Sequence, residues 1–146
     1  MSARNVEVCR AAHQAFNKRD LDAVVSAMTE DVVYHDRARG LTFRGREEYR
    51  QYTKGWTEAF SDAQISDPTY IDGGDVVVAQ FTGRGKNDGP FGYLAPTGKA
   101  AQFAYCEILR LNEGGKVVSI DAYYDQLGLL IQLGHVPAPA ASAARG

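Results

Sequence analysis

Carboxylate side chains on two predicted strands are the residues of this sequence best suited to chemistry. Asp125 follows a run of β-branched and aromatic residues, 117–124, and precedes an apolar segment that ends at Gly134. Glu107 lies on the preceding predicted strand among apolar neighbours. Desolvation beside an aromatic pocket raises the pKa of a carboxyl group, which suits it to exchange protons near neutral pH. The pattern predicts acid–base chemistry, with Asp125 as the first candidate.

Further polar residues could assist these carboxylates. A histidine such as His35 commonly titrates near neutral pH, and it could orient a carboxylate or donate to an enolate oxygen. The Tyr123 hydroxyl could polarise a carbonyl group, and Asp121 shares the strand face of Tyr123 and Asp125. Each carboxylate also has a structural interpretation. Asp125 could only cap the following helix, and Glu107 could pair with an arginine.

Aromatic residues are placed to form the wall of a pocket or a solid core. Four of them recur every three or four residues between positions 46 and 60, so their rings share one face of a predicted helix. Two others lie in the Gly- and Pro-rich connection 84–99, where they could form a pocket mouth. The residues predicted to contact a substrate are Tyr49, Tyr52, Trp56, Phe60, Phe91, Tyr93, Tyr105 and Asp121.

The elements that must position these side chains come as helices first and strands afterwards. Helical spacing occurs over 5–18, after Asp20, and over 46–60, with a short strand at 31–36 and a turn-rich segment, RARGLTFRG, between the second and third helices. Strands are predicted at 65–71, 76–83, 100–111 and 117–124, and a terminal helix at 126–133 between an Asp125 N-cap and a Gly134 C-cap. This order predicts an α+β domain, a curved antiparallel sheet with helices on one face.

Composition and missing motifs exclude several classes of protein. The net charge is −2, and the basic residues form no run, which argues against nucleic-acid or membrane partners. No GxGxxG, P-loop or GxSxG motif is present, and the three histidines are too scattered for a zinc site. We therefore expect no metal and no cofactor. The two cysteines are expected to be buried thiols in a reducing cytoplasm.

The length of 146 residues predicts a single domain over 1–135. The remaining segment, 136–146, is rich in proline and alanine without a core pattern, so we expect a disordered tail.

The sequence resembles the SnoaL-like polyketide cyclases (ester cyclases) of the nuclear transport factor 2-like superfamily. The resemblance runs from Val6 to Gly134 and is carried by the segments DVVYHD, TFRGREEY, WTEAFSD, VVVAQFTGRGKNDGPF, PTGK and GGKVVSIDAYYDQLGLLIQLG. The DQLGLLIQLG and AFSD stretches are its most specific parts.

The resemblance implies a cone: a curved mixed sheet wrapped by helices around one deep pocket, often dimerising through the sheet. It also implies cofactor-free enzymes in which an aspartate at the end of the last strand, here Asp125, closes a ring by an aldol reaction. The family commonly has an assisting histidine on the penultimate strand, where this sequence has Tyr105, Cys106 and Glu107. His35 could supply the missing partner.

These observations lead to one main hypothesis and several rivals. The main hypothesis is a cytoplasmic, homodimeric biosynthetic enzyme of the lyase or isomerase type that closes a ring in a hydrophobic polyketide-like substrate. A pericyclic or spirocyclising enzyme would use the same pocket by shape, with little pH dependence. Cofactor-free hydroxylases, dehydratases, isomerases and epoxide hydrolases share the fold. The last rival is a non-catalytic ligand-binding or dimerisation module. A binding or catalytic pocket should have a volume of about 300–1,000 Å³, whereas a structural module would be filled by side chains.

Overall fold

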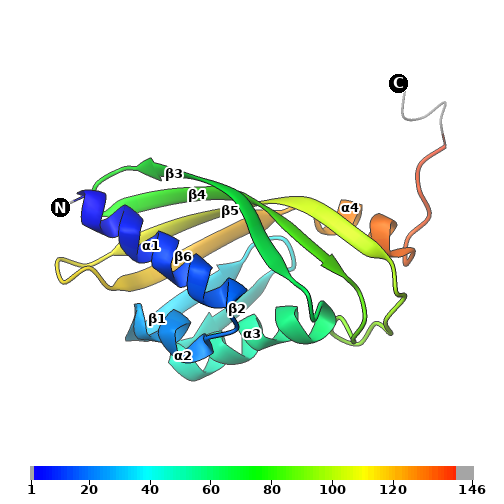
Figure 1. Cartoon of the computed structure of the whole chain (residues 1–146), viewed down its shortest axis with the longest axis horizontal. Helices are drawn as coiled ribbons and strands as arrows, with labels where there is room; N and C mark the ends of the chain where they lie inside the picture. Colours follow the sequence, from blue (N-terminus) through cyan, green and yellow to red (C-terminus); the bar gives the residue numbers. More distant parts are fainter. Residues whose placement is uncertain (1, 141–146) are drawn as a thin grey trace.

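The computed structural model describes residues 2–140 and contains four helices and six strands within that range (Figure 1). In chain order the elements are α1 (Ser2–Asn17), α2 (Leu21–Ser26), β1 (Met28–Asp36), β2 (Leu41–Arg44), α3 (Gly45–Ala59), β3 (Gln64–Asp72), β4 (Val76–Lys86), β5 (Ala100–Leu111), β6 (Val117–Tyr124) and α4 (Gln126–Leu133).

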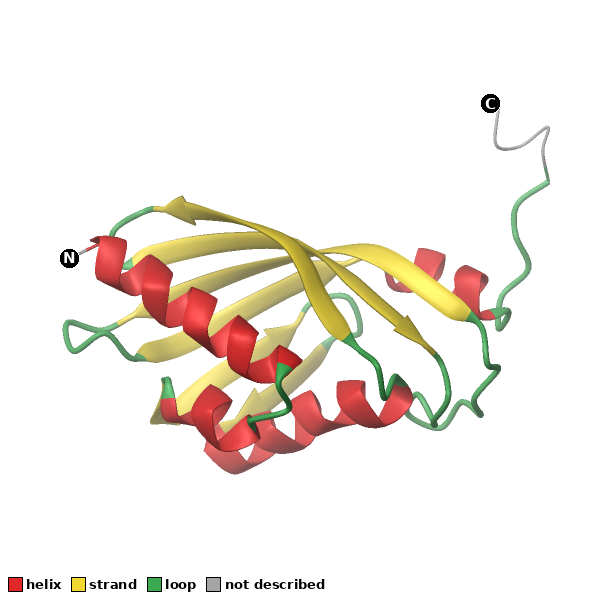
Figure 2. Ribbon diagram, in the orientation of Figure 1, coloured by secondary structure: helices red, strands yellow, loops and turns green. Residues whose placement is uncertain are grey.

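All six strands belong to one strongly twisted sheet with the order β2-β1-β6-β5-β4-β3 (Figure 2). The β1 and β6 strands are parallel, and every other neighbouring pair is antiparallel. Helices α1, α2 and α3 lie on one side of the sheet, while α4 lies beyond one end of β6. The predicted α+β class with a curved mixed sheet is confirmed.

One strand was absent from the sequence prediction. The segment LTFR forms β2, which pairs with β1 so that Phe43 lies opposite Tyr34. Its four residues fall within a stretch that was interpreted as turn-rich because of its arginines and glycines. The strand is short and lies at the sheet edge, so it depends on pairing with β1 more than on its own sequence.

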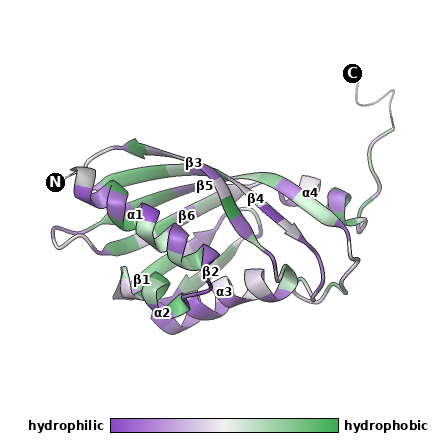
Figure 3. Cartoon of the chain, viewed as in Figure 1, coloured by the Kyte–Doolittle hydropathy of each residue, from purple (hydrophilic) through white to green (hydrophobic). Residues whose placement is uncertain are grey.

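Side chains alternate across the long strands, and one set faces the helices. On β5 the inward set includes Tyr105, Glu107 and Leu109, which are all buried. On β1 the inward residues are Tyr34 and Asp36. Hydrophobic colour follows the strands, whereas hydrophilic colour follows much of α3 (Figure 3). The core therefore lies between the concave inner face of the sheet and helices α1 to α3.

Local capping signals near the end of the chain act as the sequence predicts. The Asp125 side chain accepts a hydrogen bond from the Gly128 N–H at 2.8 Å, which caps α4. Gly134 ends the helix in the left-handed region, with a φ of 86°, where glycine is favoured. Of the predicted tail, residues 137–140 have no regular secondary structure, and residues 141–146 lie outside the described range.

None of the helices in the described range is both long and apolar enough to cross a lipid bilayer.

Candidate active site

The inner face of the sheet and the three covering helices enclose a cavity of about 90 Å³, which we call the inner cavity. Its walls carry many aromatic side chains, which include Phe16, Tyr52, Trp56, Phe81, Phe103 and Tyr105. Pockets for drug-sized ligands have volumes of about 300–1,000 Å³. The inner cavity in this conformation is smaller than the sequence analysis expected, so a large ligand can enter only if some wall side chains move.

Glu107 is the single carboxylate among the described residues that line the inner cavity. Its Oε1 atom lies 2.7 Å from Nε2 of His13, which comes from α1 and also lines the cavity. The second ring nitrogen of His13, Nδ1, lies 2.8 Å from the Tyr70 hydroxyl. Both members of the pair are buried, with exposed fractions of 7% for Glu107 and 8% for His13. A carboxyl group is thus held in a fixed orientation at an apolar wall.

Small residues on the neighbouring strands leave room for this carboxyl group. Ala79 of β4 and Ala122 of β6 lie directly opposite Glu107, and both are fully buried. Larger side chains at these two positions would compete for the space beside the carboxyl group, because directly opposed residues have neighbouring Cβ atoms.

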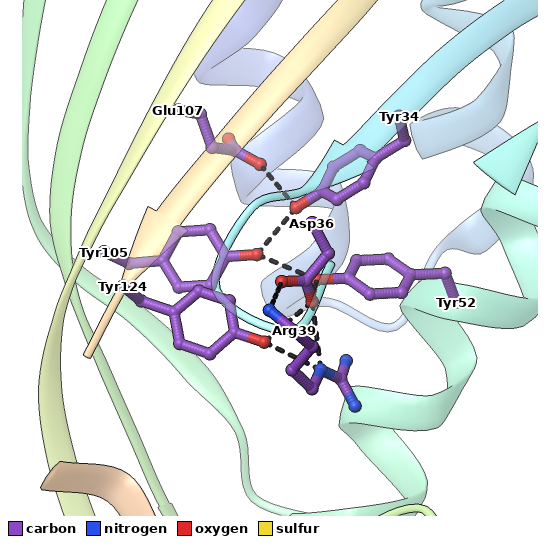
Figure 4. A network of polar contacts seen from close by, with 7 residues as sticks. All are labelled: Tyr34, Asp36, Arg39, Tyr52, Tyr105, Glu107 and Tyr124. Carbon is purple, nitrogen blue, oxygen red and sulfur yellow. Dashed lines mark hydrogen bonds and ion pairs between the residues drawn. The ribbon is translucent and has the colours of Figure 1, made fainter. Parts of the chain in front are cut away.

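A chain of tyrosine hydroxyl groups leads away from Glu107 (Figure 4). The Tyr34 oxygen lies 3.4 Å from Oε2 of Glu107 and 2.6 Å from the Tyr105 hydroxyl. The Tyr105 oxygen lies 3.1 Å from the Tyr52 hydroxyl, which donates to Oδ2 of Asp36 at 2.9 Å. The hydroxyl groups come from three different elements, β1, β5 and α3.

Asp36, at the far end of this chain, is fully buried and surrounded by donors. Its Oδ2 atom accepts from the Tyr52 hydroxyl at 2.9 Å, from the Tyr124 hydroxyl at 2.7 Å and from Nε of Arg39 at 3.0 Å. Its Oδ1 atom accepts from the Arg39 backbone N–H at 3.0 Å. Such a set of donors and a guanidinium partner stabilise an ionised carboxylate in a buried position.

Burial changes the acidity of the tyrosines in this region. Desolvation, followed by the nearby Asp36 charge, raises the pKa of Tyr52 to about 12. Desolvation likewise raises the pKa values of Tyr34 and Tyr105 well above the ordinary value. These hydroxyl groups therefore stay protonated at neutral pH and act as hydrogen-bond donors.

These raised pKa values predict a loss of stability in alkali. Above pH 10 the unfolded chain releases tyrosine protons, whereas the folded chain retains them. The tyrosines therefore contribute fully to the free energy of unfolding below pH 10, and this contribution is lost as the pH rises through 12. For Tyr52 alone, a shift of about two pKa units corresponds to about 2–3 kcal/mol. Thermal unfolding between pH 8 and 11 should show a falling midpoint above pH 10, and a smaller fall in Tyr52→Phe. An equal fall in both proteins would contradict the assignment to Tyr52.

A second depression lies on the opposite, outer face of the sheet. This outer groove has a volume of about 680 Å³, and Gln80, Thr82, Cys106, Tyr123 and Asp125 contribute to its wall. It is more open and less apolar than the inner cavity.

The structure divides the predicted site residues between these two places. Six of them line the inner cavity: Glu107, Tyr49, Tyr52, Trp56, Phe60 and Tyr105. Phe91 is buried beside the cavity and packs against Trp56 and Phe60. Tyr93 is 97% exposed, because it lies in the tight turn between Phe91 and Leu94 and points away from the cavity.

The placement predicted for Asp125 and its partners needs correction. Asp125 is exposed and lies with Tyr123 at the outer groove, not at the rim of the aromatic cavity. His35 is also on the outer face, where Nδ1 lies 3.2 Å from the Thr42 hydroxyl. Asp121 there forms ion pairs with Arg37 and Arg110. The reason is strand alternation: Tyr124, Ala122 and Asp36 face inward, so their neighbours along the chain face outward.

Four residues of the buried network were missed or set aside by the sequence analysis: His13, Asp36, Arg39 and Tyr124. His13 falls at helical spacing within the predicted helix 5–18, which indicates a buried position but reveals no partner. Asp36 ends the DVVYHD segment, and its alternation with Tyr34 was the signal that could have identified it. Nothing in the local sequence joins Arg39 to Tyr124, since they are 85 residues apart.

The epoxide-hydrolase alternative required an Asp–Arg–Asp arrangement inside the pocket. Arg37 and Arg110 both contact Asp121, and their side chains are about half exposed on the outer face. The required arrangement is therefore not formed by these residues in the inner cavity.

Among residues 2–140, no group of three or more His, Cys, Asp or Glu side chains is gathered as a potential metal site.

Comparison with known proteins adds a family match. The family model for SnoaL-like polyketide cyclase matches residues 6–133. None of the curated proteins compared with the chain matches it.

Three similar solved structures cover nearly the whole chain. AclR from Streptomyces galilaeus has a TM-score of 0.85 and 23% identity, covering 99% of this chain and 90% of its own. A protein from Jannaschia sp. CCS1 has a TM-score of 0.84 and 20% identity, with coverages of 93% and 95%. IdmH from Streptomyces antibioticus has a TM-score of 0.77 and 22% identity, with coverages of 89% and 98%. The three are described, respectively, as a putative hydroxylase, SnoaL-like polyketide cyclase and polyketide cyclase. At these identities the likeness establishes the fold.

Proposed function

Because the chain belongs to the SnoaL-like polyketide cyclase family, we propose that it is a cofactor-independent enzyme that closes a ring in a hydrophobic, polyketide-like substrate. The observation that carries this proposal is the buried Glu107–His13 pair at the wall of an aromatic cavity. A titratable group fixed at an apolar, concave surface is the arrangement expected of an acid–base enzyme.

The proposed chemistry is an aldol-type ring closure. Glu107 takes a proton from the carbon next to a substrate carbonyl, and the resulting carbanion forms a C–C bond with a second carbonyl carbon. The alkoxide that forms receives the proton back from Glu107, so the protons balance. His13 orients the carboxyl group through its 2.7 Å hydrogen bond, and Tyr70 holds the other ring nitrogen.

Trp56 supplies a candidate donor for the developing enolate oxygen. Its indole N–H is buried and has no hydrogen-bond partner within residues 2–140, and its ring lines the inner cavity. The N–H lies near the Tyr52 hydroxyl without meeting the geometry of a hydrogen bond. A preorganised donor of this kind stabilises charge that develops in the transition state.

The small volume of the inner cavity favours one rival, a non-catalytic module whose aromatic residues form a filled core. The two proposals differ in whether the aromatic wall opens for a ligand. Trp56 packs against Tyr52, Phe60, Phe91 and Phe103, so ligand entry must rearrange its surroundings.

Trp56 allows a direct test because it is the only tryptophan in the sequence. We would titrate the protein with a panel of polyketide-like methyl esters, record tryptophan fluorescence, and follow ring closure and deuterium exchange next to the carbonyl in D₂O. The enzyme proposal expects a saturable fluorescence change together with protein-dependent exchange and ring closure. Binding without exchange or closure would favour a binding module, and no response from either readout would favour a filled core.

The homodimer implied by the family resemblance and the expected cytoplasmic location are further predictions. For a dimer, the outer face of the sheet is the surface we expect, because Tyr123 and Ile71 are about half exposed there.

A further inference from the structure

Two buried carboxyl groups, Glu107 and Asp36, lie at the ends of one continuous hydrogen-bond chain (Figure 4). Four contacts join them through the hydroxyl groups of Tyr34, Tyr105 and Tyr52: the distances are 3.4, 2.6, 3.1 and 2.9 Å. Each contact needs one proton between its two oxygen atoms to be attractive. Three hydroxyl groups supply three protons, so one more proton is needed for the four contacts.

The Asp36 end of the chain determines the direction of the protons. Asp36 accepts from Arg39 and Tyr124 as well as from Tyr52, as expected of an ionised carboxylate. Because Tyr52 gives its proton to Asp36, the contact between Tyr105 and Tyr52 is attractive only if Tyr105 donates to Tyr52, and the 2.6 Å contact then requires Tyr34 to donate to Tyr105. With these three contacts each holding a proton, Tyr34 has none left for Glu107 and accepts at that contact; Tyr34 could donate to Glu107 only if the Tyr105–Tyr52 contact held no proton.

The Glu107 end then holds two acceptors face to face if Glu107 is ionised. Oε2 of Glu107 and the Tyr34 oxygen would carry no proton between them at 3.4 Å, and the carboxylate would have His13 as its only donor in the described structure. An unsatisfied buried carboxylate oxygen is costly. A proton on Oε2 removes the conflict, since a neutral carboxyl group donates to Tyr34 while Oε1 still accepts from His13.

We propose that the Tyr34–Tyr105–Tyr52 chain is a proton relay that holds one additional proton between Glu107 and Asp36, resting on Glu107. Transfer runs from Oε2 of Glu107 to Tyr34, from Tyr34 to Tyr105, from Tyr105 to Tyr52 and from Tyr52 to Oδ2 of Asp36. Each oxygen in between loses one proton and gains one, so the relay ends with an ionised Glu107 and a neutral Asp36.

The consequence for catalysis rests on the proposed function. When the proton is on Glu107, Glu107 can act as a general acid. When the proton is on Asp36, Glu107 is ionised and can act as a general base. The Asp36–Arg39 ion pair favours the first state, because neutralising Asp36 weakens its attraction to the guanidinium group.

The competing arrangement places the proton on His13, giving an imidazolium–carboxylate pair. The titratable groups that face Glu107 are Cys9 and His13 of α1, Tyr34 of β1, Tyr49 of α3, Tyr70 of β3 and Tyr105 of β5. No arginine or lysine among the described residues forms an ion pair with Glu107. The competing arrangement leaves the contact between Tyr34 and Glu107 without a proton.

Infrared spectroscopy of the substrate-free protein near pH 7 separates these arrangements. We expect the carbonyl stretching band of a protonated carboxyl group in the wild type and its loss in Glu107→Gln. Tyr52→Phe should also remove the band, although it does not contact Glu107. Without Tyr52, two hydroxyl groups serve two contacts, so Tyr105 can donate to Tyr34 and Tyr34 to an ionised Glu107. Tyr105→Phe should also remove the carbonyl band, and it replaces Tyr52→Phe in the experiment if that variant does not fold.

Tyr49→Phe is the matched control, because Tyr49 is a buried tyrosine of the same helix outside the chain, and it should retain the band. Absence of the band in the wild type would overturn the proposal. Persistence of the band in the Tyr52 and Tyr105 variants would also overturn it, since burial alone would then hold the proton. No substrate enters this experiment, so its failure and the failure of the proposed ring closure are distinguishable.

Discussion

Glu107→Gln should lower kcat by about 10²–10⁴-fold, the usual contribution of a general acid or base, while the protein remains folded. The amide preserves the local hydrogen bonds: its oxygen can accept from His13, and its N–H can donate to the Tyr34 oxygen. Only the ability to exchange a proton is lost. The measurement is the steady-state rate of ring closure or deuterium exchange, accompanied by thermal unfolding of each protein.

Asp125→Asn tests whether Glu107 or Asp125 is the acid–base group. Asparagine is as good an N-cap as aspartate, so this variant should fold and, on the present proposal, should keep its activity within about tenfold. Glu113→Gln, in the exposed turn between β5 and β6, is a neutral control for loss of a charge. If Asp125→Asn loses activity and Glu107→Gln does not, the acid–base group is Asp125 at the outer groove, the residue that the family resemblance implied.

Asp36→Ala should destabilise the fold by about 3–5 kcal/mol, the usual cost of breaking a buried ion pair. The substitution leaves the Arg39 guanidinium without its carboxylate and removes the acceptor of the Tyr52 and Tyr124 hydroxyl groups. Chemical denaturation should show a lower midpoint with little change in slope.

Asp121→Ala is the matched control for this measurement. Asp36 pairs with one arginine, and Asp121 pairs with two, but the two arginine side chains at Asp121 are about half exposed on the outer face. Such pairs contribute about 0–1 kcal/mol, so the loss should be small. Equal losses for Asp36→Ala and Asp121→Ala would contradict the structural importance assigned to the buried cluster.

The inner cavity and the outer groove place different demands on a substrate. The inner cavity has the titratable pair and the aromatic wall, but its volume of about 90 Å³ requires rearrangement before a large molecule can bind. The outer groove has sufficient volume, about 680 Å³, but its carboxylate, Asp125, is exposed and already caps α4. Of these two carboxylates, Glu107 is buried and Asp125 is exposed.

The sequence by itself determined the features that depend on near neighbours along the chain. Alternation on β5 puts Tyr105, Glu107 and Leu109 on one face, and the helical spacing of α3 puts Tyr52 and Trp56 on one side. These periodicities follow from strand and helix geometry, so they could be predicted before any tertiary contact was known. The same holds for the caps of α2 and α4.

Only the tertiary structure decided which face of each strand is the inside. On β6 the neighbours Tyr123 and Tyr124 are equally suited to either face, and pairing with β1 and β5 turns Tyr124 inward. The His13–Glu107 contact joins residues 94 positions apart, so no local spacing could reveal it. Hydrogen bonds between distant residues arise from the curvature of the sheet and the packing of α1 and α3 against it. The sequence therefore indicated several members of the candidate site, and the fold decided which of them are in contact with one another.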